Sequence, residues 1–567
     1  MLKKKWTLLG KEHDREKIME IKDAYGLAPI LAVVLLNRGI DNVEEFIHPE
    51  IELLRDPFLM KGMDVAAERI LRAQNAGEHI TVYGDYDVDG ITSTAALVKF
   101  LQTHGAEVDY YIPDRLEEGY GLSCDAIDTI AARGTKLLIT VDCGITAVDE
   151  INYAKECGMD VIVTDHHECK DALPSALCIL NPKQPDCPYP FQKLAGVGVV
   201  FKLLEALTIQ MKFHKQELLD EYLDLIAVGT VADVMPLVGE NRIIVKKGLA
   251  LLKYTSNKGL RALMAQAQVD PAAVTAGTIG FILAPRINAA GRMGDPGSAV
   301  EMLLARDEKT AERYAELLDE ENRARQQAEQ DILEDALRIL SEDASMENDY
   351  VLVISGEGWH HGIIGIVASK ISEQTGKPCI LISTTDGMGK GSGRSIKGFN
   401  LFRALELCGE DLTKFGGHEL AAGLSIAEEK IKSFREHINT HARTVLSEDD
   451  FIPSIHIDSE LPIPYINMNT AEKLSILEPY GMGNPNPLFM ARGLSVASMR
   501  LLSEGKHLKL TLSGEGYSAD AIGFGMGEYA EFLSQGDFVD VVFHLDINNF
   551  RGERHVQMIL KDIRSSN

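Results

Sequence analysis

The sequence is short of basic residues, of long apolar runs and of paired cysteines. Lysine and arginine number 57 against 85 aspartate and glutamate residues, which gives a formal net charge of −28. Such a chain does not coat duplex DNA or an anionic membrane non-specifically, because its overall field repels polyanions. Any site for a polyanion is therefore expected to be local, as a basic or metal-charged channel.

The apolar runs and the cysteines set two further limits. Residues 30–36 form the longest apolar run near the start, far below the roughly 20 residues that span a bilayer. Three lysines at 3–5 precede too short an apolar stretch for a signal peptide. The eight cysteines form no C-x-x-C pair, so neither a zinc knuckle nor a disulfide framework is indicated. We therefore expect a cytoplasmic protein.

The chain is too long for a single core, and its length predicts about two to four domains. From residue 76 onward, short apolar runs alternate with helical stretches, which predicts a parallel sheet with helices on both faces. Residues 298–348 contain no Gly or Pro and favour long helices, including a connector between lobes. The β-rich end fits an OB-type barrel, although its periodicity also allows a sandwich. The expected segments are 1–75 (helical), 76–297 (α/β), 298–348 (helical), 349–450 (α/β) and 451–567 (β-rich).

Three aspartates, Asp85, Asp87 and Asp89, follow the first apolar run at a spacing of two. Alternate residues of an extended segment point the same way, so at least two carboxylates can face one point. A calcium loop is excluded, because its twelfth position requires Glu and is Ala96 here. Taken alone, the motif fits a metal site and a solvated acidic turn equally well.

Other acidic and imidazole groups follow further predicted strands. Asp142 ends one strand, Asp165, His166 and His167 end the next, and Asp233 follows the mostly apolar stretch 223–231. The carboxyl ends of parallel strands meet at one edge, where ligands collect. So many carboxylates cannot ionise together unless cations neutralise them, and oxygen ligands with an imidazole suit Mn²⁺ or Mg²⁺. Such ions could run two-metal hydrolysis of a phosphate ester.

These segments resemble the four motifs of the DHH phosphoesterases. The matching segments are YGDYDVDG at 83–90, VDCG at 141–144, DHH at 165–167 and VAD at 231–233. Further stretches are similar to the bacterial single-strand-specific exonucleases of that family: YIPDR at 111–115, PRINAAGR at 285–292, WHHG at 359–362, FGGH at 415–418 and PYGMGNP at 479–485. The resemblance covers almost the whole chain.

The resemblance implies an α/β fold of two lobes. A parallel-sheet DHH domain and a smaller DHH-associated, substrate-binding α/β domain would be joined by a long helix, with a C-terminal OB-type β-barrel that binds nucleic acid. The implied activity is 5′→3′ hydrolysis of single-stranded DNA to 5′-mononucleotides with two ions, Mn²⁺ or Mg²⁺, in recombination and repair. Single-strand-binding protein and a RecQ-type helicase are expected partners of a monomer. The alternatives are a DHH-family oligoribonuclease or small-nucleotide phosphatase, and a non-catalytic replication scaffold.

The resemblance also implies roles for individual residues. Asp87 and Asp142 would hold one ion, with Asp142 shared between both. The second ion would be held by Asp89, Asp142, His166 and Asp233. Asp85 and His167 would lie outside the ligand set or face the phosphate, and His167 would assist the leaving group. Related pyrophosphatases carry His where Tyr83 stands here, so the first ion is expected to bind more weakly or to be present only with substrate.

A glycine-rich stretch at 387–405 carries four basic residues and no acidic one, which reverses the sign of the chain. Its backbone amides could approach a phosphate closely, and the alternative is a solvated hairpin. By resemblance, Ser392, Arg394 and Arg115 would hold a 5′-phosphate, and His418 would line the same cleft. Further expected contacts, each weighed against an ordinary structural role, are Arg286, Asn288 and Arg292 to phosphate or sugar and Tyr120 to a base. His360 and His361 fit a cleft and a solvated turn equally well.

Two nucleotide motifs can be excluded. Gly196 and Gly198 precede a helix, but Phe201 occupies the third glycine position of a dinucleotide fingerprint. No G-x-x-x-x-G-K-[ST] segment occurs, so NTP-driven translocation is not indicated. The enzyme is expected to advance by successive hydrolysis alone.

Overall fold

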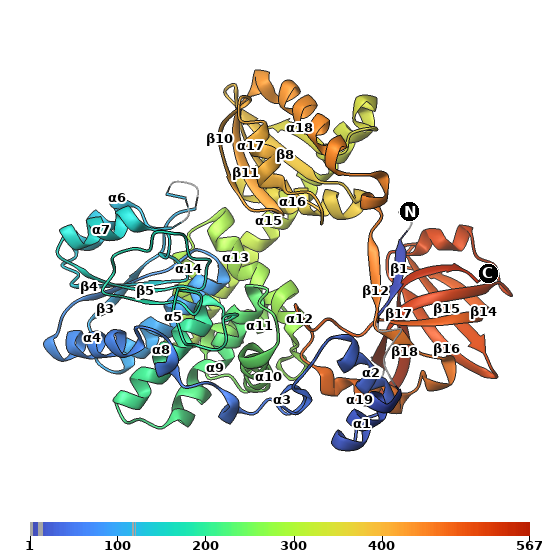
Figure 1. The fold of residues 1–567 in the computed structure, drawn as a ribbon, viewed down its shortest axis with the longest axis horizontal. Helices are drawn as coiled ribbons and strands as arrows, with labels where there is room; N and C mark the ends of the chain where they lie inside the picture. The colour runs from blue at the N-terminus through green and yellow to red at the C-terminus, as the bar shows by residue number, and fades with distance from the viewer. Residues whose placement is uncertain (1–3, 10–14, 116–117, 120, 551, 567) are drawn as a thin grey trace. The chain divides into compact units, whose positions relative to one another are not determined.

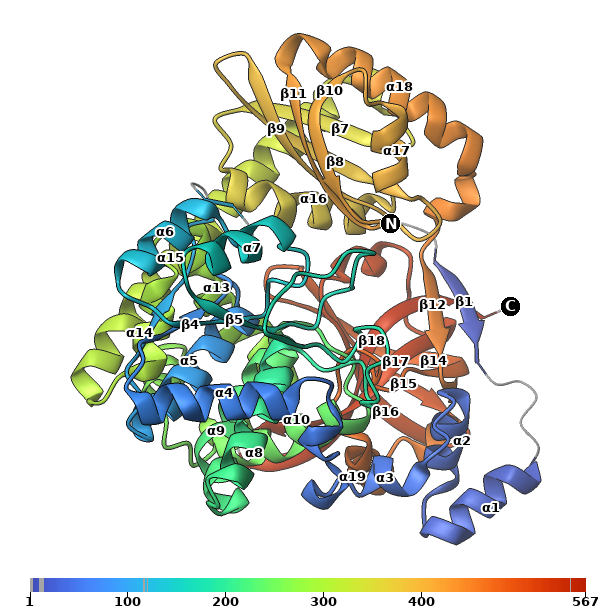
Figure 2. The same cartoon turned by 60° about the vertical axis from the view of Figure 1, so that its left-hand side comes forward.

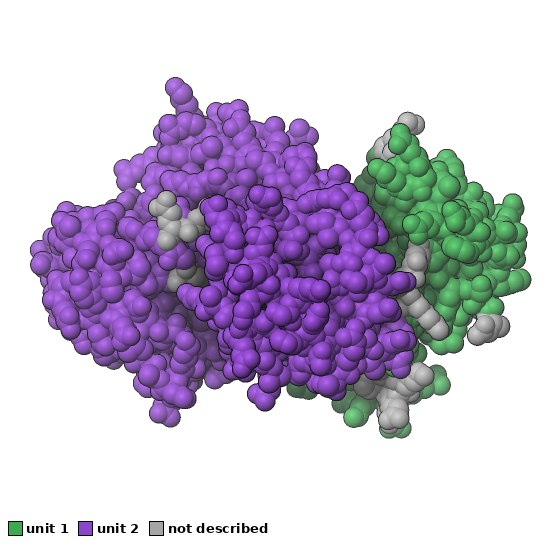
Figure 3. All heavy atoms as spheres, turned by 90° about the horizontal axis from the view of Figure 1, so that it is seen from above, with its two compact units in different colours: residues 1, 3–50, 453–567 green, residues 2, 51–452 purple. Residues whose placement is uncertain are grey.

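The computed structural model describes residues 4–9, 15–115, 118–119, 121–550 and 552–566. These form two compact units, one from the chain up to Glu50 together with Pro453 onward, the other from Ile51–Ile452 (Figure 3). The sequence does not predict that both ends of the chain share a unit, and the five segment boundaries stay predictions. Within the described ranges, every helix falls short of what a membrane-spanning segment requires.

The first lobe of the larger unit is built on a five-stranded parallel sheet in the order β3-β2-β4-β5-β6 (Figure 1). Because β3 lies on one side of β2 and the later strands on the other, the order reverses between β2 and β4. Ligands of such sheets bind beyond the carboxyl ends at this reversal. The strands are β2 (Ile80–Tyr83), β3 (Val108–Tyr111), β4 (Leu137–Val141), β5 (Asp160–Thr164) and β6 (Cys178–Leu180).

Helices cover both faces of this sheet, as the sequence predicts (Figure 2). Leu137 and Ile139 of β4 share one core with α5 and α8, whereas Leu138 packs with α6 and α7 on the other face. This period of two is what a strand buried on both sides requires. The helices of the lobe include α4 (Met63–Ala76), α5 (Val88–Thr103), α6 (Cys124–Ala132), α7 (Val148–Glu156), α8 (Gly196–Gln210), α9 (Lys215–Ala232), α10 (Gly239–Leu252), α11 (Lys258–Gln266) and α13 (Ala284–Met293).

A long helix joins the two lobes of the larger unit. After α14 (Gly297–Leu304), α15 (Glu308–Glu342) runs for 35 residues. Ala311 near its start is buried in the core of the first lobe, and Ala336 near its end is buried in the core of the second. One helix thus contributes to both cores, which confirms the predicted connector.

The second lobe contains a five-stranded sheet in the order β10-β11-β9-β8-β7, in which only β7 and β8 run parallel. One face packs on α15 and α16, and the other packs on α17 and α18. The elements are β7 (Leu352–Glu357), α16 (His361–Thr375), β8 (Cys379–Thr385), β9 (Met388–Arg394), α17 (Leu401–Leu407), β10 (Leu412–Gly417), β11 (Ala421–Ala427) and α18 (Ile431–Val445).

The smaller unit is a closed five-stranded barrel with added helices. Its strands pair in the cyclic order β14-β15-β16-β18-β17, and β17 closes the ring onto β14. This closure decides for a barrel over a sandwich, and the parallel β16–β18 pair fits the Greek-key order of an OB fold. The strands are β14 (Phe489–Leu502), β15 (His507–Gly514), β16 (Tyr517–Gly523), β17 (Phe538–Phe550) and β18 (Glu553–Ser565).

The start of the chain packs within this smaller unit. Helices α2 (Pro29–Asn37) and α3 (Val43–Ile47) bury apolar side chains in the core of the barrel unit. The strand β1 (Lys5–Leu8) pairs in parallel with β12 (Ser454–Ile457). The sequence predicts helices alone for the first segment, because the partner that makes β1 a strand comes from the far end of the chain.

Candidate active site

The first acidic motif forms a tight turn between β2 and α5. The carboxylate of Asp87 caps the helix by accepting the N–H of Gly90 at 3.0 Å. Position 90 requires glycine, since a Cβ there would lie 2.4 Å from the carbonyl oxygen of Asp85. The turn therefore folds back on itself, and it brings Asp85, Asp87 and Asp89 to the carboxyl end of β2.

Asp89 is buried against the start of α8. Its two carboxylate oxygens accept the N–H groups of Gly196 at 2.7 Å and Val197 at 2.8 Å. A Cβ at Gly196 would lie 2.7 Å from the Cβ of Asp142, so only glycine lets the helix start approach both carboxylates. Gly196, the first glycine of the segment that fails as a dinucleotide motif, thus supports Asp89, because the positive end of a helix stabilises an anion. Sequence reasoning missed this role.

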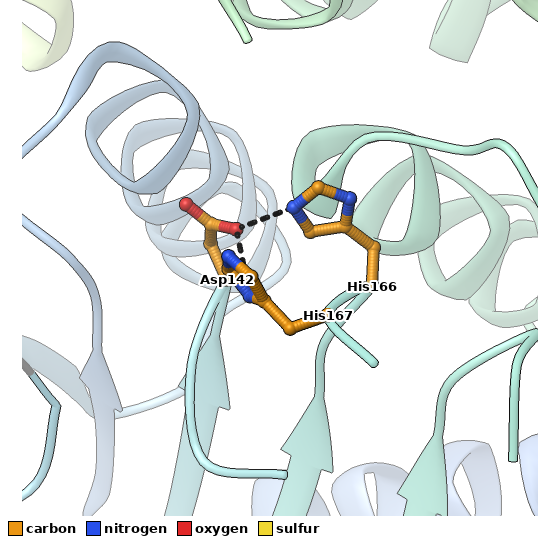
Figure 4. Close-up of side chains that lie close together, drawn as sticks. All are labelled: Asp142, His166 and His167. Atoms are coloured by element: carbon orange, nitrogen blue, oxygen red, sulfur yellow. Dashed lines mark ion pairs between the residues drawn. The ribbon is translucent and has the colours of Figure 1, made fainter. Parts of the chain in front are cut away.

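Asp142 and His166 lie at the centre of the site (Figure 4). Asp142 directly follows β4, has a positive φ of 61° and is buried. Its Oδ1 lies 3.2 Å from Nε2 of His166 and 4.0 Å from Nδ1 of His167. The same His166 nitrogen lies 3.5 Å from Oδ2 of Asp233, at the end of α9, and 3.9 Å from Oδ2 of Asp89. Four separate segments of the chain therefore meet at one imidazole.

Several buried atoms of this cluster have no hydrogen-bond partner among the described residues. They include Oδ1 of Asp85, Oδ1 of Asp142, Oδ2 of Asp233 and Nε2 of His166. An unpaired buried polar atom costs about 1–3 kcal/mol, more when it is charged. Carboxylate oxygens with one imidazole are a donor set that suits Mn²⁺ or Mg²⁺, so the residues fit divalent cations. Ligand atoms within 4.8 Å of one another come from three groups: Asp85, Asp87 and Asp142; Asp89, His166 and Asp233; Asp142, His166 and His167.

The electrostatics of the cluster agree with this geometry. Burial, followed by the charge of a neighbouring carboxylate, raises the pKa of Asp85 to about 8 and that of Asp233 to about 9. Burial and the surrounding aspartates also raise the pKa of Asp142 far above its ordinary range. Burial lowers the pKa of His166 to about 3, which keeps its imidazole neutral, as a metal ligand must be. Only added positive charge lets these carboxylates ionise together.

Asp165 orients the second histidine of the motif. Its Oδ1 lies 2.7 Å from Nδ1 of His167, and its Oδ2 accepts the N–H of Ile145 at 2.9 Å. Although burial opposes it, the hydrogen bond to Asp165 raises the pKa of His167 above its ordinary value. The sequence contains Asp165 within the motif but gives no sign of this orienting bond.

Tyr83 stands where related pyrophosphatases carry His, and its side chain is engaged elsewhere. It is fully buried in the core with α6 and α7. Its hydroxyl donates to the carbonyl of Gly121 at 2.8 Å, and its ring stacks on Tyr111 at 5.4 Å between centroids. Position 83 therefore contributes to packing in this structure.

Three arginines gather beside the carboxylates, and we call Arg115, Arg292 and Arg394 the arginine cluster. Arg292 donates to the carbonyl of Gly362, at the start of α16, at 2.6 Å, and Arg394 donates to the hydroxyl of Ser392 at 3.2 Å. Burial, then Arg115 and other arginines, lowers the pKa of Arg292 to about 10, which shows that the like charges are close. Within the described ranges, none of the three has a carboxylate at ion-pair distance.

The other residues predicted to contact the DNA strand have different surroundings in the structure. Arg286 forms a 2.9 Å ion pair with Asp319, which is the ordinary structural role expected as the alternative to a contact with phosphate or sugar. Asn288 is half-buried on α13. His418 is exposed in the β10–β11 turn, and Ala421 at the other end of that turn pairs in register with Arg394. Tyr120 lies outside the described residues. His360 caps α16, accepting the N–H of Gly362 at 3.1 Å, and His361 is exposed at its first turn.

Comparison with known proteins covers the same regions. Family models match at residues 79–230 (DHH family, N-terminal domain), 348–444 (DHHA1 domain) and 457–562 (RecJ OB domain). The single-stranded-DNA-specific exonuclease RecJ of Bacillus subtilis (strain 168) is 39% identical over 99% of this chain and 71% of its own length. RecJ of Escherichia coli (strain K12) is 36% identical over 95% of this chain and 96% of its own. The chain belongs to the RecJ family.

Solved RecJ structures share the whole architecture. The crystal structure of RecJ in complex with Mn²⁺ from Thermus thermophilus matches with a TM-score of 0.86 at 32% identity, over 99% of this chain and 80% of that one. The corresponding complex with Mg²⁺ matches with a TM-score of 0.79 at 31% identity, over 99% and 79%. The predicted RecJ architecture of two α/β lobes, a long connecting helix and an OB-type barrel is thereby confirmed.

Proposed function

We propose that this RecJ-family chain is a 5′→3′ exonuclease that hydrolyses single-stranded DNA to 5′-mononucleotides by two-metal-ion chemistry, with Mn²⁺ or Mg²⁺. One observation carries the proposal. Buried carboxylates with unpaired oxygens form a set that requires cations for charge balance. This set lies next to the arginine cluster, which can bind an anion. A DNA end bearing a phosphate, together with divalent ions, satisfies both.

Within this proposal, Asp87 and Asp142 hold one ion, while Asp89, Asp142, His166 and Asp233 hold the other. Bound ions activate water and neutralise the charge that develops on the scissile phosphate. His167, oriented by Asp165, lies close enough to Asp142 to act on the same phosphate, and it gives a proton to the departing O3′ of the terminal nucleotide. Asp85, whose ligand atom lies within 4.8 Å of those of Asp87 and Asp142, supports the first ion from outside its ligand set or faces the phosphate.

The arginine cluster accounts for the direction of attack. Arg115, Arg394 and Ser392 hold the terminal 5′-phosphate, while Asn288, Arg292, His418 and Tyr120 contact the strand nearby. The guanidinium of Arg286 is already paired with Asp319. Cleavage of the P–O3′ bond releases a 5′-mononucleotide and leaves a new 5′-phosphate on the shortened strand. The product end therefore presents the same group to the same arginines, so hydrolysis repeats without NTP.

The OB barrel would bind the strand further along, since such folds bind single strands by stacking and backbone contacts. We place the enzyme in the cytoplasm, as a monomer acting in DNA recombination and repair. Single-strand-binding protein and a RecQ-type helicase are the proposed partners, because both produce or present single strands.

The test uses purified protein and single-stranded DNA labelled separately at each end, with a blunt duplex and short RNA for comparison, in Mn²⁺, Mg²⁺ or EDTA. We expect mononucleotides from the 5′ end of single strands only, in the presence of metal only. Asp142→Ala should abolish release, whereas the matched surface variant Asp171→Asn should not. Degradation of short RNA alone would favour an oligoribonuclease. DNA binding without turnover under every metal would favour a scaffold.

A further inference from the structure

One residue of the metal-binding turn has no part in the chemistry above. Tyr86 lies between Asp85 and Asp87, and its ring faces the guanidinium of Arg115, with the centroid 5.0 Å from the Cζ atom. The backbone at this point packs closely against α13, since a Cβ at Gly291 would lie 2.8 Å from the carbonyl oxygen of Tyr86. The ring therefore contacts Arg115 from a part of the turn whose backbone is closely packed.

Arg115 is the member of the arginine cluster whose guanidinium lies over the turn that carries Asp85 and Asp87. Burial and then the charge of Asp87 raise the pKa of Asp85, and the positive charge of Arg115 is among the influences that oppose this rise. After burial, it also lowers the pKa of Arg394 and of His360, both from the second lobe. The guanidinium thus lies near the carboxylates of the first lobe and the cations of the second.

The kind of support that Arg115 receives is informative. Its neighbours Arg292 and Arg394 repel it, so it needs an attractive contact to stay in place before a phosphate arrives. A carboxylate would supply that contact but would cancel the charge that a phosphate must find. Among the described residues no carboxylate lies at ion-pair distance from it, and the aromatic face attracts the cation without neutralising it.

We propose that Tyr86 is a positioning residue that holds Arg115 for the terminal 5′-phosphate and thereby sets the preference for 5′-phosphorylated over 5′-hydroxyl strands. The proposal rests on the function proposed above and names the part of that site that selects the end group. Because a cation–π contact of this kind is modest, its loss should reduce kcat/KM on a 5′-phosphorylated strand about 3- to 30-fold.

The experiment compares two 3′-labelled oligonucleotides of one sequence, one with a 5′-phosphate and one with a 5′-hydroxyl. The proteins are wild type, Tyr86→Phe, Tyr86→Leu, Arg115→Ala and the Tyr86→Leu/Arg115→Ala double variant. We expect Tyr86→Leu to raise KM for the phosphorylated strand and to leave the hydroxyl strand unchanged. Tyr86→Phe keeps the ring and should behave as wild type. The double variant should equal Arg115→Ala, because both changes remove one contact.

Two controls separate this inference from damage to the turn and from failure of the proposed function. Stabilisation of Tyr86→Leu by Mn²⁺ in thermal unfolding should match wild type, which shows that the metal ligands are intact. Binding of both oligonucleotides in EDTA, followed by fluorescence anisotropy, gives the end preference without turnover. Wild type without hydrolysis would overturn the proposed function, while the anisotropy comparison would still decide on Tyr86. An unchanged preference in Tyr86→Leu, or a Tyr86→Phe variant as impaired as Tyr86→Leu, would overturn the role of the ring.

Discussion

The carboxylate cluster and a second buried charge cluster of the same lobe differ in one respect. Around Asp142, three buried carboxylate oxygens lack hydrogen-bond partners in the described part of the chain: Oδ1 of Asp85, Oδ1 of Asp142 and Oδ2 of Asp233. In the second cluster, the fully buried Lys202 lies 2.8 Å from Glu205 and 2.8 Å from Glu240, and it donates to the carbonyl of Arg55 at 3.0 Å. Both clusters are buried and charged, so what marks the first as functional is missing compensation, not burial.

The arginine cluster repeats this lesson with the opposite sign. Arg292 and Arg394 contact only backbone and hydroxyl oxygens among the described residues, whereas Arg286 on the same helix as Arg292 is paired with Asp319. A buried ion pair with both partners present is complete by itself. The arginine cluster has no carboxylate partner among the described residues, so it can bind an anion that comes from outside the chain.

Removing the carboxylate of Asp142, which would be shared by both ions, is the strongest test of the difference between the two buried clusters. Asp142→Asn keeps the shape of the side chain but removes one ligand from two of the three groups. We expect kcat to fall at least about 1,000-fold, because metal stabilisation of the transition state is worth several kcal/mol. Metal-dependent release of mononucleotides measures it, with Asp171→Asn as the matched control. A loss below tenfold would contradict the assignment of Asp142 as the bridging ligand.

The next largest effect should come from the arginine cluster. Arg394→Gln removes a cation that has no carboxylate partner among the described residues, so the fold loses little while the phosphate loses a charged donor. We expect kcat/KM on 5′-phosphorylated DNA to fall about 10- to 100-fold, as for a charged hydrogen bond left unmade. Arg403→Gln, an exposed residue of the same lobe, serves as control. Equal losses in both variants would point to general electrostatics and not to a site.

The carboxylate positions could be predicted from sequence because each depends on a local pattern. Asp142 and Asp165 directly follow buried apolar runs, and parallel strands bring their ends together without further information. The support of these residues could not be predicted in the same way. The amides that hold Asp89 come from Gly196 and Val197, and only the packing of α8 against α5 brings them near.

The fold divides along the same line. Local residue patterns predict the alternation of strands and helices, the connector and the barrel. The strand character of β1 depends on β12 at the other end of the chain, and short segments adopt β structure only where a partner exists. Tyr83 is the first residue of the motif. Its ring nevertheless packs on the face of the sheet that α6 and α7 cover, because side chains alternate between the two faces along a β strand.

A smaller effect should follow from removing the orientation of His167. Asp165→Asn keeps an acceptor but removes the charge that raises the pKa of His167. We expect kcat to fall about tenfold, the lower end for partners that orient groups around a metal site. The alkaline limb of the pH profile of kcat should shift to lower pH, since His167 must be protonated to assist the leaving group and would then lose its proton more easily. A profile identical to wild type would show that His167 needs no such support.

The smallest and most general effect concerns stability in the absence of metal. Because burial and neighbouring carboxylates raise the pKa of Asp85 to about 8 and of Asp233 to about 9, the folded protein retains protons that the unfolded chain releases near pH 4. The free energy of unfolding therefore falls as the pH rises toward those values. His166, whose pKa is lowered to about 3, has the opposite effect only below its ordinary value of about 6.5.

The interval from about pH 7 to about pH 9 consequently excludes the effect of His166, and thermal unfolding in that interval tests whether the charge of the carboxylates is uncompensated. His167, whose pKa is raised, adds to the same fall. In EDTA we expect Tm to fall by several degrees across it. Mg²⁺ should remove the fall, because a cation that binds only the folded state stabilises it more as its ligands ionise. Asp142→Asn, with one carboxylate fewer, should show a shallower fall in EDTA, and Asp171→Asn should not. If Tm depends on pH equally with and without Mg²⁺, the cluster is not compensated by cations, and the contrast with the paired Lys202 cluster loses its functional meaning.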